Sequence, residues 1–356
     1  MYTHDFNPER TGMELFFLIP GNINALTGGY LYNRYMVEGM RKKGHVVEIL
    51  QLDECMLQAQ EIEAKCSLIF KKLRTGSIVL IDSLVLGVLH RVMKKFHGKL
   101  TFMGIIHLPL SYNPLADKKR QFIAKSEVEA MQHTSRLIVT GRLTFRLLTE
   151  SGISSEIIIL IEPGVEDFPR KQHYAAVPSQ LLCISNYSPV KDQLLLARAL
   201  CRLRTRNWTL HMYGNTNTDK EYVDRLNTFI VREKLNDRIF LHDVIQRKNI
   251  SGAFLASDLF VLPTQFETYG MVLSESLAHG IPLVTTTSGN ISETVPPTMG
   301  RFIEPGNLEN MVSALEELFT DQQLYKSLCK SAADYYKQAS PWQTSIDKLE
   351  RIISEV

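Results

Sequence analysis

Short β-branched runs alternate with longer segments of helical period along the chain, and this alternation constrains the fold more than any other feature. The first series of strand candidates is "LFFLIP", "HVVEIL", "SIVLID", "LTFMGIIHL", "RLIVTG" and "IIILIEPG". The second series is "LLCIS", "WTLHMYG", "IFLHDV", "LFVLPT", "PLVTTT" and "GRFIEPG". Strands that alternate with helices are typical of parallel sheets, so the pattern predicts an α/β protein with doubly wound sheets.

The two series are separated by "EPGVEDFPRKQHYAAVPSQ", which carries three prolines and little periodicity. We interpret this stretch as a linker between domains. A chain of 356 residues is long enough for two domains that each bury a core. We therefore expect a first domain over residues 1–166 and a second over residues 167–340.

Composition excludes several classes of protein. Hydrophobic residues make up 44% of the chain and charged residues 22%, which is typical of an ordered globular protein. The formal net charge of +2 is too small to indicate a nucleic-acid partner. Basic clusters at 41–43, 93–99 and 117–125 are most simply solvated helix faces, and contact with an anionic membrane surface or acceptor is the alternative.

Cysteine usage and the N-terminal sequence bear on the compartment. Five widely spaced cysteines without a CxxC pair indicate a reducing environment. The apolar run that ends at Pro20 is too short for a signal peptide or a membrane span. We expect a cytoplasmic protein, and peripheral contact with the cytoplasmic membrane face stays open.

Loops that follow strands are the candidate sites, because doubly wound domains bind ligands at the C-terminal ends of their strands. In "PGNINALTGGY", Gly28 and Gly29 precede a helix whose backbone N–H groups could hold a phosphate. The loop matches neither GxGxxG nor a Walker sequence. His107 ends an apolar strand, where a ligand-facing and a structural histidine are about equally expected.

The loop after "LLCIS" contains Asn186 and Lys191, and Lys191 stands just before the amphipathic helix "DQLLLARALCRL". A lysine in this position could reach an anionic group of a ligand. Taken alone, it is more often a solvated surface charge.

Two glutamates follow the strand "LFVLPT", in "FETYGMVLSES". Glu267 lies in the loop, the helix is expected to start near Tyr269 or Gly270, and Glu275 is expected about two turns into that helix. The glutamates then point to different sides and do not form a tight acid and base pair. They suit two acceptors along one elongated ligand, such as a nucleotide-diphosphate sugar, with the helix N-terminus free for a phosphate. Two exposed glutamates on an ordinary helix are the alternative.

The segment "PTQFETYGMVLSESLAHGIPLVTTTSGNISETV" resembles the signature of the retaining glycosyltransferases of family 4. Further matches in the same order are "TGGY", "RKKGHVVEIL", His107, "IEPGVED", "SPVKDQLLLARAL" and Trp342, so the resemblance covers nearly the whole chain. It implies the GT-B architecture, with two facing Rossmann-like domains and an interdomain cleft. The first would be the acceptor domain, completed by a C-terminal helix at 341–356, and the second the nucleotide-sugar donor domain.

The resemblance also implies roles for the motif residues. Glu275 would bind the ribose, Glu267 hydroxyls of the donor sugar, and Lys191 the diphosphate. His107 would line the site of the donor sugar. The backbone groups expected near the sugar or the phosphates are those of Gly28, Gly29, Thr268, Tyr269, Gly270 and Met271.

The reaction implied is hexosyl transfer in glycan biosynthesis, with retention of the anomeric configuration. The donor would be a UDP-sugar or GDP-sugar, and the acceptor a hydroxyl of a saccharide, a lipid or a small molecule. No protein nucleophile is assigned. No cofactor or metal is expected, and the sequence contains no Asp-x-Asp motif.

One position departs from the family pattern. Asn186 stands where the family usually has an arginine, and a neutral amide cannot replace a bidentate phosphate clamp. Arg142 or Arg247 could compensate. Otherwise the chain would be a weak or inactive nucleotide-sugar binding or scaffold protein. An epimerase or phosphorylase of the same fold is also conceivable, whereas an NAD-dependent oxidoreductase is disfavoured by the missing GxGxxG.

Overall fold

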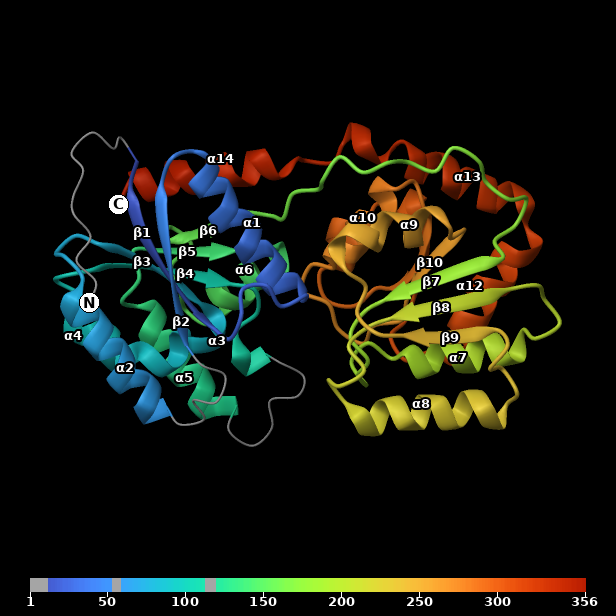
Figure 1. The fold of residues 1–356 in the computed structure, drawn as a ribbon, viewed down its shortest axis with the longest axis horizontal. Coiled ribbons are helices and arrows are strands. Elements are labelled where there is room, and N and C mark those ends of the chain that lie inside the picture. The colour runs from blue at the N-terminus through green and yellow to red at the C-terminus, as the bar shows by residue number, and fades with distance from the viewer. Residues whose placement is uncertain (1–11, 53–58, 113–119) are drawn as a thin grey trace. The chain divides into compact units, whose positions relative to one another are not determined.

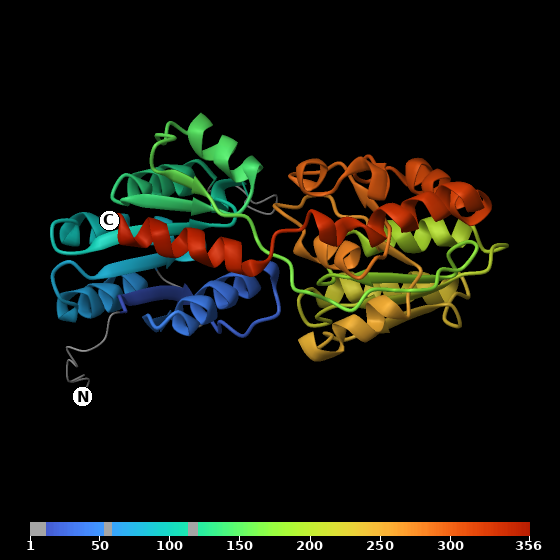
Figure 2. The ribbon, with the colours of Figure 1, turned by 90° about the horizontal axis from the view of Figure 1, so that it is seen from above.

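The computed structural model describes residues 12–52, 59–112 and 120–356 (Figure 1). The chain forms two compact units, which are Met1–Pro163 together with Trp342–Val356, and Gly164–Pro341. Each unit contains one six-stranded sheet with helices on both faces (Figures 1 and 2). All strand pairs within these sheets are parallel, as the alternating pattern predicts.

The sheet of the first unit has the strand order β2-β1-β3-β4-β5-β6. Its strands are β1 (Glu14–Pro20), β2 (Val46–Leu52), β3 (Ile78–Asp82), β4 (Thr101–Ile106), β5 (Arg136–Val139) and β6 (Ile158–Leu160). Its main helices are α1 (Gly28–Lys42), α2 (Ala59–Lys72), α4 (His90–Phe96), α5 (Arg120–Met131), α6 (Arg142–Glu150) and α14 (Trp342–Ser354). The central strands are almost continuously apolar and buried, because helices cover both of their faces.

The C-terminal helix α14 lies beside α1 in the first unit (Figure 2). The ring of Trp342 stacks on Tyr35 with the ring centroids 4.1 Å apart. A Cβ atom at Gly39 would lie 2.3 Å from the Cδ1 atom of Ile346, so the close approach of the two helices requires a glycine there. The Lys43 ammonium group also forms an ion pair with Glu350, at 2.5 Å.

The sheet of the second unit has the strand order β12-β11-β10-β7-β8-β9. Its strands are β7 (Gln180–Ile184), β8 (Thr209–Tyr213), β9 (Ile239–His242), β10 (Leu259–Leu262), β11 (Leu283–Thr286) and β12 (Gly300–Ile303). Its helices of six or more residues are α7 (Gln193–Arg202), α8 (Lys220–Arg232), α9 (Ile250–Leu255), α10 (Met271–Ala278), α12 (Leu308–Thr320) and α13 (Gln322–Ala333).

Counted from β7, this sheet has the 3-2-1-4-5-6 order of Rossmann folds. The first and fourth strands of the unit, β7 and β10, are therefore neighbours, and Leu181 pairs with Leu259. In doubly wound folds, the strand order reverses between the first and fourth strands, and this place is called the topological switch point. Ligands of doubly wound folds bind at such a switch point.

The predicted fold class is confirmed, and every predicted strand is present with an end shifted by at most a few residues. One prediction was wrong in detail. Glu275 is the fifth residue of α10 and therefore lies about one turn into the helix, because the helix begins only after Gly270. Cys55, residues 1–11 and residues 117–119 of a basic cluster lie outside the described residues. Within the described ranges, no helix is long and apolar enough to cross a membrane.

Candidate functional site

The loop after β7 places Lys191 directly before α7. Asp192 is the N-cap of this helix, and its carboxylate accepts a hydrogen bond from the backbone N–H of Leu195 at 3.3 Å. Asp192 has a φ of 49°, in the left-handed region that non-glycine residues rarely adopt. Burial raises the pKa of its carboxyl group. A strained residue is thus held next to the lysine that the sequence singled out.

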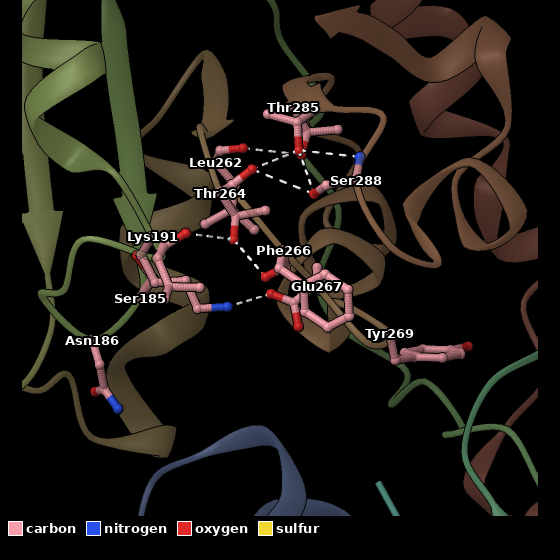
Figure 3. Close-up of polar contacts among 12 residues, drawn as sticks. Ser185, Asn186, Lys191, Leu262, Thr264, Phe266, Glu267, Tyr269, Thr285 and Ser288 are labelled. Atoms are coloured by element: carbon pink, nitrogen blue, oxygen red, sulfur yellow. Dashed lines mark hydrogen bonds and ion pairs between the residues drawn. The ribbon is translucent and has the colours of Figure 1, made fainter. Parts of the chain in front are cut away.

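The Lys191 ammonium group donates a hydrogen bond to the carboxylate of Glu267, which lies in the loop after β10 (Figure 3). Both side chains are largely buried, with 25% and 15% of their areas exposed. Gln265 joins the same two loops, because its backbone N–H donates to the Val190 carbonyl at 2.6 Å and its side-chain amide to Asp192 at 2.5 Å. The switch point therefore holds a lysine and a carboxylate in one rigid frame.

The backbone of Glu267 is held by the loop that follows β11. The Asn290 N–H donates to the Glu267 carbonyl at 3.0 Å. Gly289 has a φ of 61°, and a Cβ atom at this position would lie 1.9 Å from the same carbonyl oxygen. Only glycine fits between the two loops, so Gly289 fixes the position of Glu267.

Helix α10 begins immediately after the loop that follows β10. Its N-cap Gly270 has a φ of 80°, and within the described part of the chain no side chain caps the helix. The segment of Thr268, Tyr269, Gly270 and Met271 therefore presents backbone groups at a helix N-terminus, where an anion is stabilised. The Tyr269 carbonyl accepts a hydrogen bond from Thr294 at 3.1 Å, which holds this segment in place.

Glu275 lies on α10 and has a different cationic partner from Glu267. Its Oε1 atom lies 2.5 Å from the Arg247 guanidinium, which also contacts Glu166 at 2.6 Å. The Glu275 side chain is 9% exposed, and burial raises the pKa of its carboxyl group while Arg247 opposes that shift. Glu267 and Glu275 thus do not form a carboxylate pair, as the spacing predicts, and each is balanced by its own cation.

Asn186 stands apart from the Lys191–Glu267 ion pair (Figure 3). Its side-chain oxygen lies 3.5 Å from the backbone N–H of Asn215, and its carbonyl accepts a hydrogen bond from Gln193 at 3.0 Å. The guanidinium group of Arg247, which the sequence suggests as a replacement for the missing arginine, contacts the carboxylates of Glu166 and Glu275.

The first unit has a separate cavity of about 210 Å³ at the C-terminal ends of β1, β3 and β4. Gly29, Ser83 and His107 are among the residues that line it. A Cβ atom at Gly29 would lie 3.1 Å from the Cδ2 atom of His107, whereas one at Gly28 would meet open space. A side chain at position 29 would therefore crowd the ring of His107, whereas one at position 28 would not.

His107 is held by buried polar neighbours. Its Nε2 atom lies 3.0 Å from the side-chain oxygen of Asn33, whose amide nitrogen donates to Asp82 at 2.6 Å. The rings of Tyr32 and His107 form a T-shaped pair with the ring centroids 5.4 Å apart. Burial lowers the pKa of His107, and the nearby Asp82 charge opposes this shift only in part. The imidazole is therefore neutral at neutral pH.

Sequence reasoning missed several of these residues. Arg247 was only a weak candidate, and its pairing with Glu275 has no signal in the sequence. Asp82 could have been noticed, because it ends β3 just as His107 follows β4. Asn33 lies inside α1, and no motif in the sequence of this helix indicates a functional role for it. Among the described residues, no group of three or more His, Cys, Asp or Glu side chains could hold a metal ion.

Comparison with known proteins identifies relatives. Residues 166–335 match the family described as glycosyl transferases group 1. Mannosylfructose-phosphate synthase of Agrobacterium fabrum is 24% identical over 216 residues, which are 55% of this chain and 47% of that protein. The chain spans less than half the length of the first curated relatives it matches.

Two solved structures share the fold of the chain. Sucrose-phosphate synthase from Thermosynechococcus elongatus has a TM-score of 0.83 at 16% identity, over 96% of this chain and 98% of that one. Anabaena Alr3699/HepE, solved in complex with UDP and glucose, has a TM-score of 0.80 at 17% identity, over 97% of this chain and 100% of that one. Both units are Rossmann-like domains, and residues 166–335, which make up most of the second unit, match the family of glycosyl transferases group 1.

Proposed function

We propose that this protein is a retaining hexosyltransferase, which moves a sugar from a nucleotide-diphosphate sugar to an acceptor hydroxyl without a metal ion. The observation that carries the proposal is the arrangement around the N-terminus of α10. Glu267 beside Lys191 and Glu275 beside Arg247 are two ionic pairs on either side of an uncapped helix start. The match of residues 166–335 to the family of glycosyl transferases group 1 supports the same function.

The donor would bind along this arrangement in the second unit. Glu275 would accept hydrogen bonds from the ribose, and Arg247 offsets part of the rise in its pKa that burial causes. Glu267 would bind hydroxyls of the sugar. The diphosphate would lie against the backbone N–H groups of residues 268–271, where the helix dipole favours negative charge.

Lys191 would stabilise the departing diphosphate. In the absence of ligand it binds Glu267, so it must share or exchange that contact when a phosphate arrives. Negative charge grows on the diphosphate in the transition state, and a preorganised ammonium group is most effective there. Retention would follow if the acceptor attacks from the face that the diphosphate leaves, without a protein nucleophile.

The first unit would serve the acceptor, which is a saccharide, a lipid or a small molecule. His107 would line the donor sugar's site, with Gly28 and Gly29 near the phosphates. UDP-sugars and GDP-sugars are the proposed donors, and the complex of Alr3699/HepE with UDP and glucose supports the first of them. A cytoplasmic location is part of the proposal, and peripheral contact with the cytoplasmic membrane face stays open.

The test is release of nucleotide diphosphate from a panel of UDP-sugars and GDP-sugars in EDTA, with and without pooled acceptors. Retention is read from the anomeric proton coupling of the product. Turnover that needs an added divalent ion would refute metal independence, and an inverted product would refute retention.

A weak or inactive donor-binding protein is the second candidate, and Asn186 favours it. The matched test is Asn186→Arg, which restores the family's usual cation. If the wild type binds donor without turnover and Asn186→Arg reacts, the natural protein is a binding protein with a disabled transfer step. Turnover by the wild type as fast as that of Asn186→Arg would exclude this candidate.

A further inference from the structure

The polar residues behind His107 determine which of its ring nitrogens carries the proton. The neighbours form a chain of hydrogen bonds inside the first unit, from Asp82 through Asn33 to the imidazole. Asn33 is fully buried, and Asp82 is 2% exposed. The chemistry of the members of this chain sets the direction of each bond.

The direction of the first bond follows from the carboxylate. An ionised Asp82 side chain can only accept hydrogen bonds, so the Asn33 group at 2.6 Å must be its amide nitrogen. The other Asp82 oxygen already accepts from the backbone N–H of Leu84 at 2.8 Å. Turning the Asn33 amide over would place two oxygens against each other, so its orientation is fixed.

The direction of the second bond follows from the first. With the nitrogen of Asn33 turned to Asp82, its carbonyl oxygen faces the Nε2 atom of His107 at 3.0 Å. This oxygen has no hydrogen to donate, so Nε2 must carry the proton. In a neutral imidazole the other ring nitrogen, Nδ1, then has a lone pair and accepts hydrogen bonds.

We propose that Asp82, acting through Asn33 and through its own Oδ2 atom, which lies 3.7 Å from Nε2, holds His107 as the Nε2–H tautomer, so that Nδ1 is the atom that accepts a hydrogen bond from a ligand hydroxyl. Asn33 and Asp82 are positioning residues, since they act through His107. His107 lines the cavity, and a ligand there that brings an O–H donor to Nδ1 would be favoured by this tautomer. The tautomer follows from the first unit alone, whereas the use of Nδ1 for a sugar hydroxyl rests on the proposed function.

The test is nitrogen NMR of the full chain labelled with ¹⁵N-histidine, at a pH where His107 is neutral. Protonated and unprotonated ring nitrogens have distinct shifts, and His107→Gln identifies the signals of His107. We expect the wild type to show a protonated Nε2 and an unprotonated Nδ1. A predominantly protonated Nδ1 in the wild type would overturn the proposal.

Two variants and one control test the role of the neighbours. Leucine has a similar shape to asparagine, and Asn33→Leu removes the side-chain oxygen that accepts from Nε2. The ratio of the Nε2–H to the Nδ1–H tautomer should therefore fall by roughly tenfold, which corresponds to the loss of a hydrogen bond worth about 1.4 kcal/mol. Asp82→Asn lets the Asn33 amide turn over and should shift the ratio in the same direction, which covers the case in which Asn33→Leu does not fold.

The control is Thr144→Val, because the Thr144 hydroxyl donates to the backbone carbonyl of His107 at 3.1 Å and not to its ring. Its tautomer ratio should match that of the wild type. An unchanged ratio in both Asn33→Leu and Asp82→Asn would refute the relay. The spectra need no substrate, so a failed transfer assay would leave this result standing, and a failed relay would leave the proposed transfer intact.

Discussion

Arg247 offers the sharpest stability test, because its removal leaves the buried carboxylate of Glu275 without a cation. The two groups are 2.5 Å apart, and the Glu275 side chain is 9% exposed. Breaking a buried ion pair by removing one partner costs about 3–5 kcal/mol. Arg247 itself is 24% exposed, so we expect the lower end, about 3 kcal/mol, for Arg247→Met at pH 8.

This loss should depend on pH in a defined direction. Burial already raises the pKa of Glu275 above its ordinary value, and removal of Arg247 raises it further. A folded-state pKa above the unfolded value means that the folded state binds the proton more tightly. The stability of Arg247→Met therefore falls as the pH rises from near the ordinary glutamate value through the raised pKa. The deficit relative to wild type should be smaller at pH 5 than at pH 8.

The assay is urea unfolding followed by tryptophan fluorescence. The chain has two tryptophans, with Trp208 in the core of the second unit and Trp342 in the first. In a Trp342→Phe background the fluorescence reports the second unit only, which avoids treating two units as one two-state transition. Glu275→Gln should recover part of the stability that Arg247→Met loses, since it removes the uncompensated charge. A deficit that is equal at both pH values and is not reduced by Glu275→Gln would refute the reasoning.

Three further substitutions have defined outcomes. Gly289→Ala should lower the free energy of unfolding by more than the about 1–2 kcal/mol of a left-handed residue, because its Cβ atom would meet the Glu267 carbonyl. Thermal unfolding measures this loss. The control is Gly252→Ala, whose Cβ atom would meet open space and which should not show the extra loss. Lys191→Ala should lower single-turnover rates by roughly 10²–10³-fold with little change in the donor Kd. A loss of donor affinity as large as the loss of rate would contradict the role of Lys191 in the transition state. Trp342→Ala should destabilise the first unit by about 3–5 kcal/mol in urea, whereas a change within 1 kcal/mol would show that its stacking matters little.

The strands of the fold could be predicted because a parallel strand covered on both faces must be apolar along its length. "LFFLIP" and "LFVLPT" satisfy this condition, and both are buried strands in the structure. Strand order could not be predicted. The pairing of β7 with β10 brings Lys191 to Glu267, although the two residues are 76 positions apart.

The rest of the candidate site depends on contacts that leave no mark in the sequence. Arg247 reaches Glu275 from a short 3-10 turn, and no periodicity connects the two. Gly289 could be recognised as a loop residue, but its role depends on a carbonyl of another loop. Local pattern therefore identifies the residues that follow strands, and tertiary packing decides which of them meet.

The central claim is that the second unit binds a nucleotide-diphosphate sugar through Glu275, and a thermal-shift screen tests it most directly. UDP, GDP, ADP and TDP and their common sugar conjugates would be added in the absence of metal ions. A ligand that binds the folded state raises its stability by mass action, so one nucleotide should stand out in the wild type. The account predicts that Glu275→Ala loses this shift. An equal shift in the variant, or no shift with any nucleotide, would contradict it.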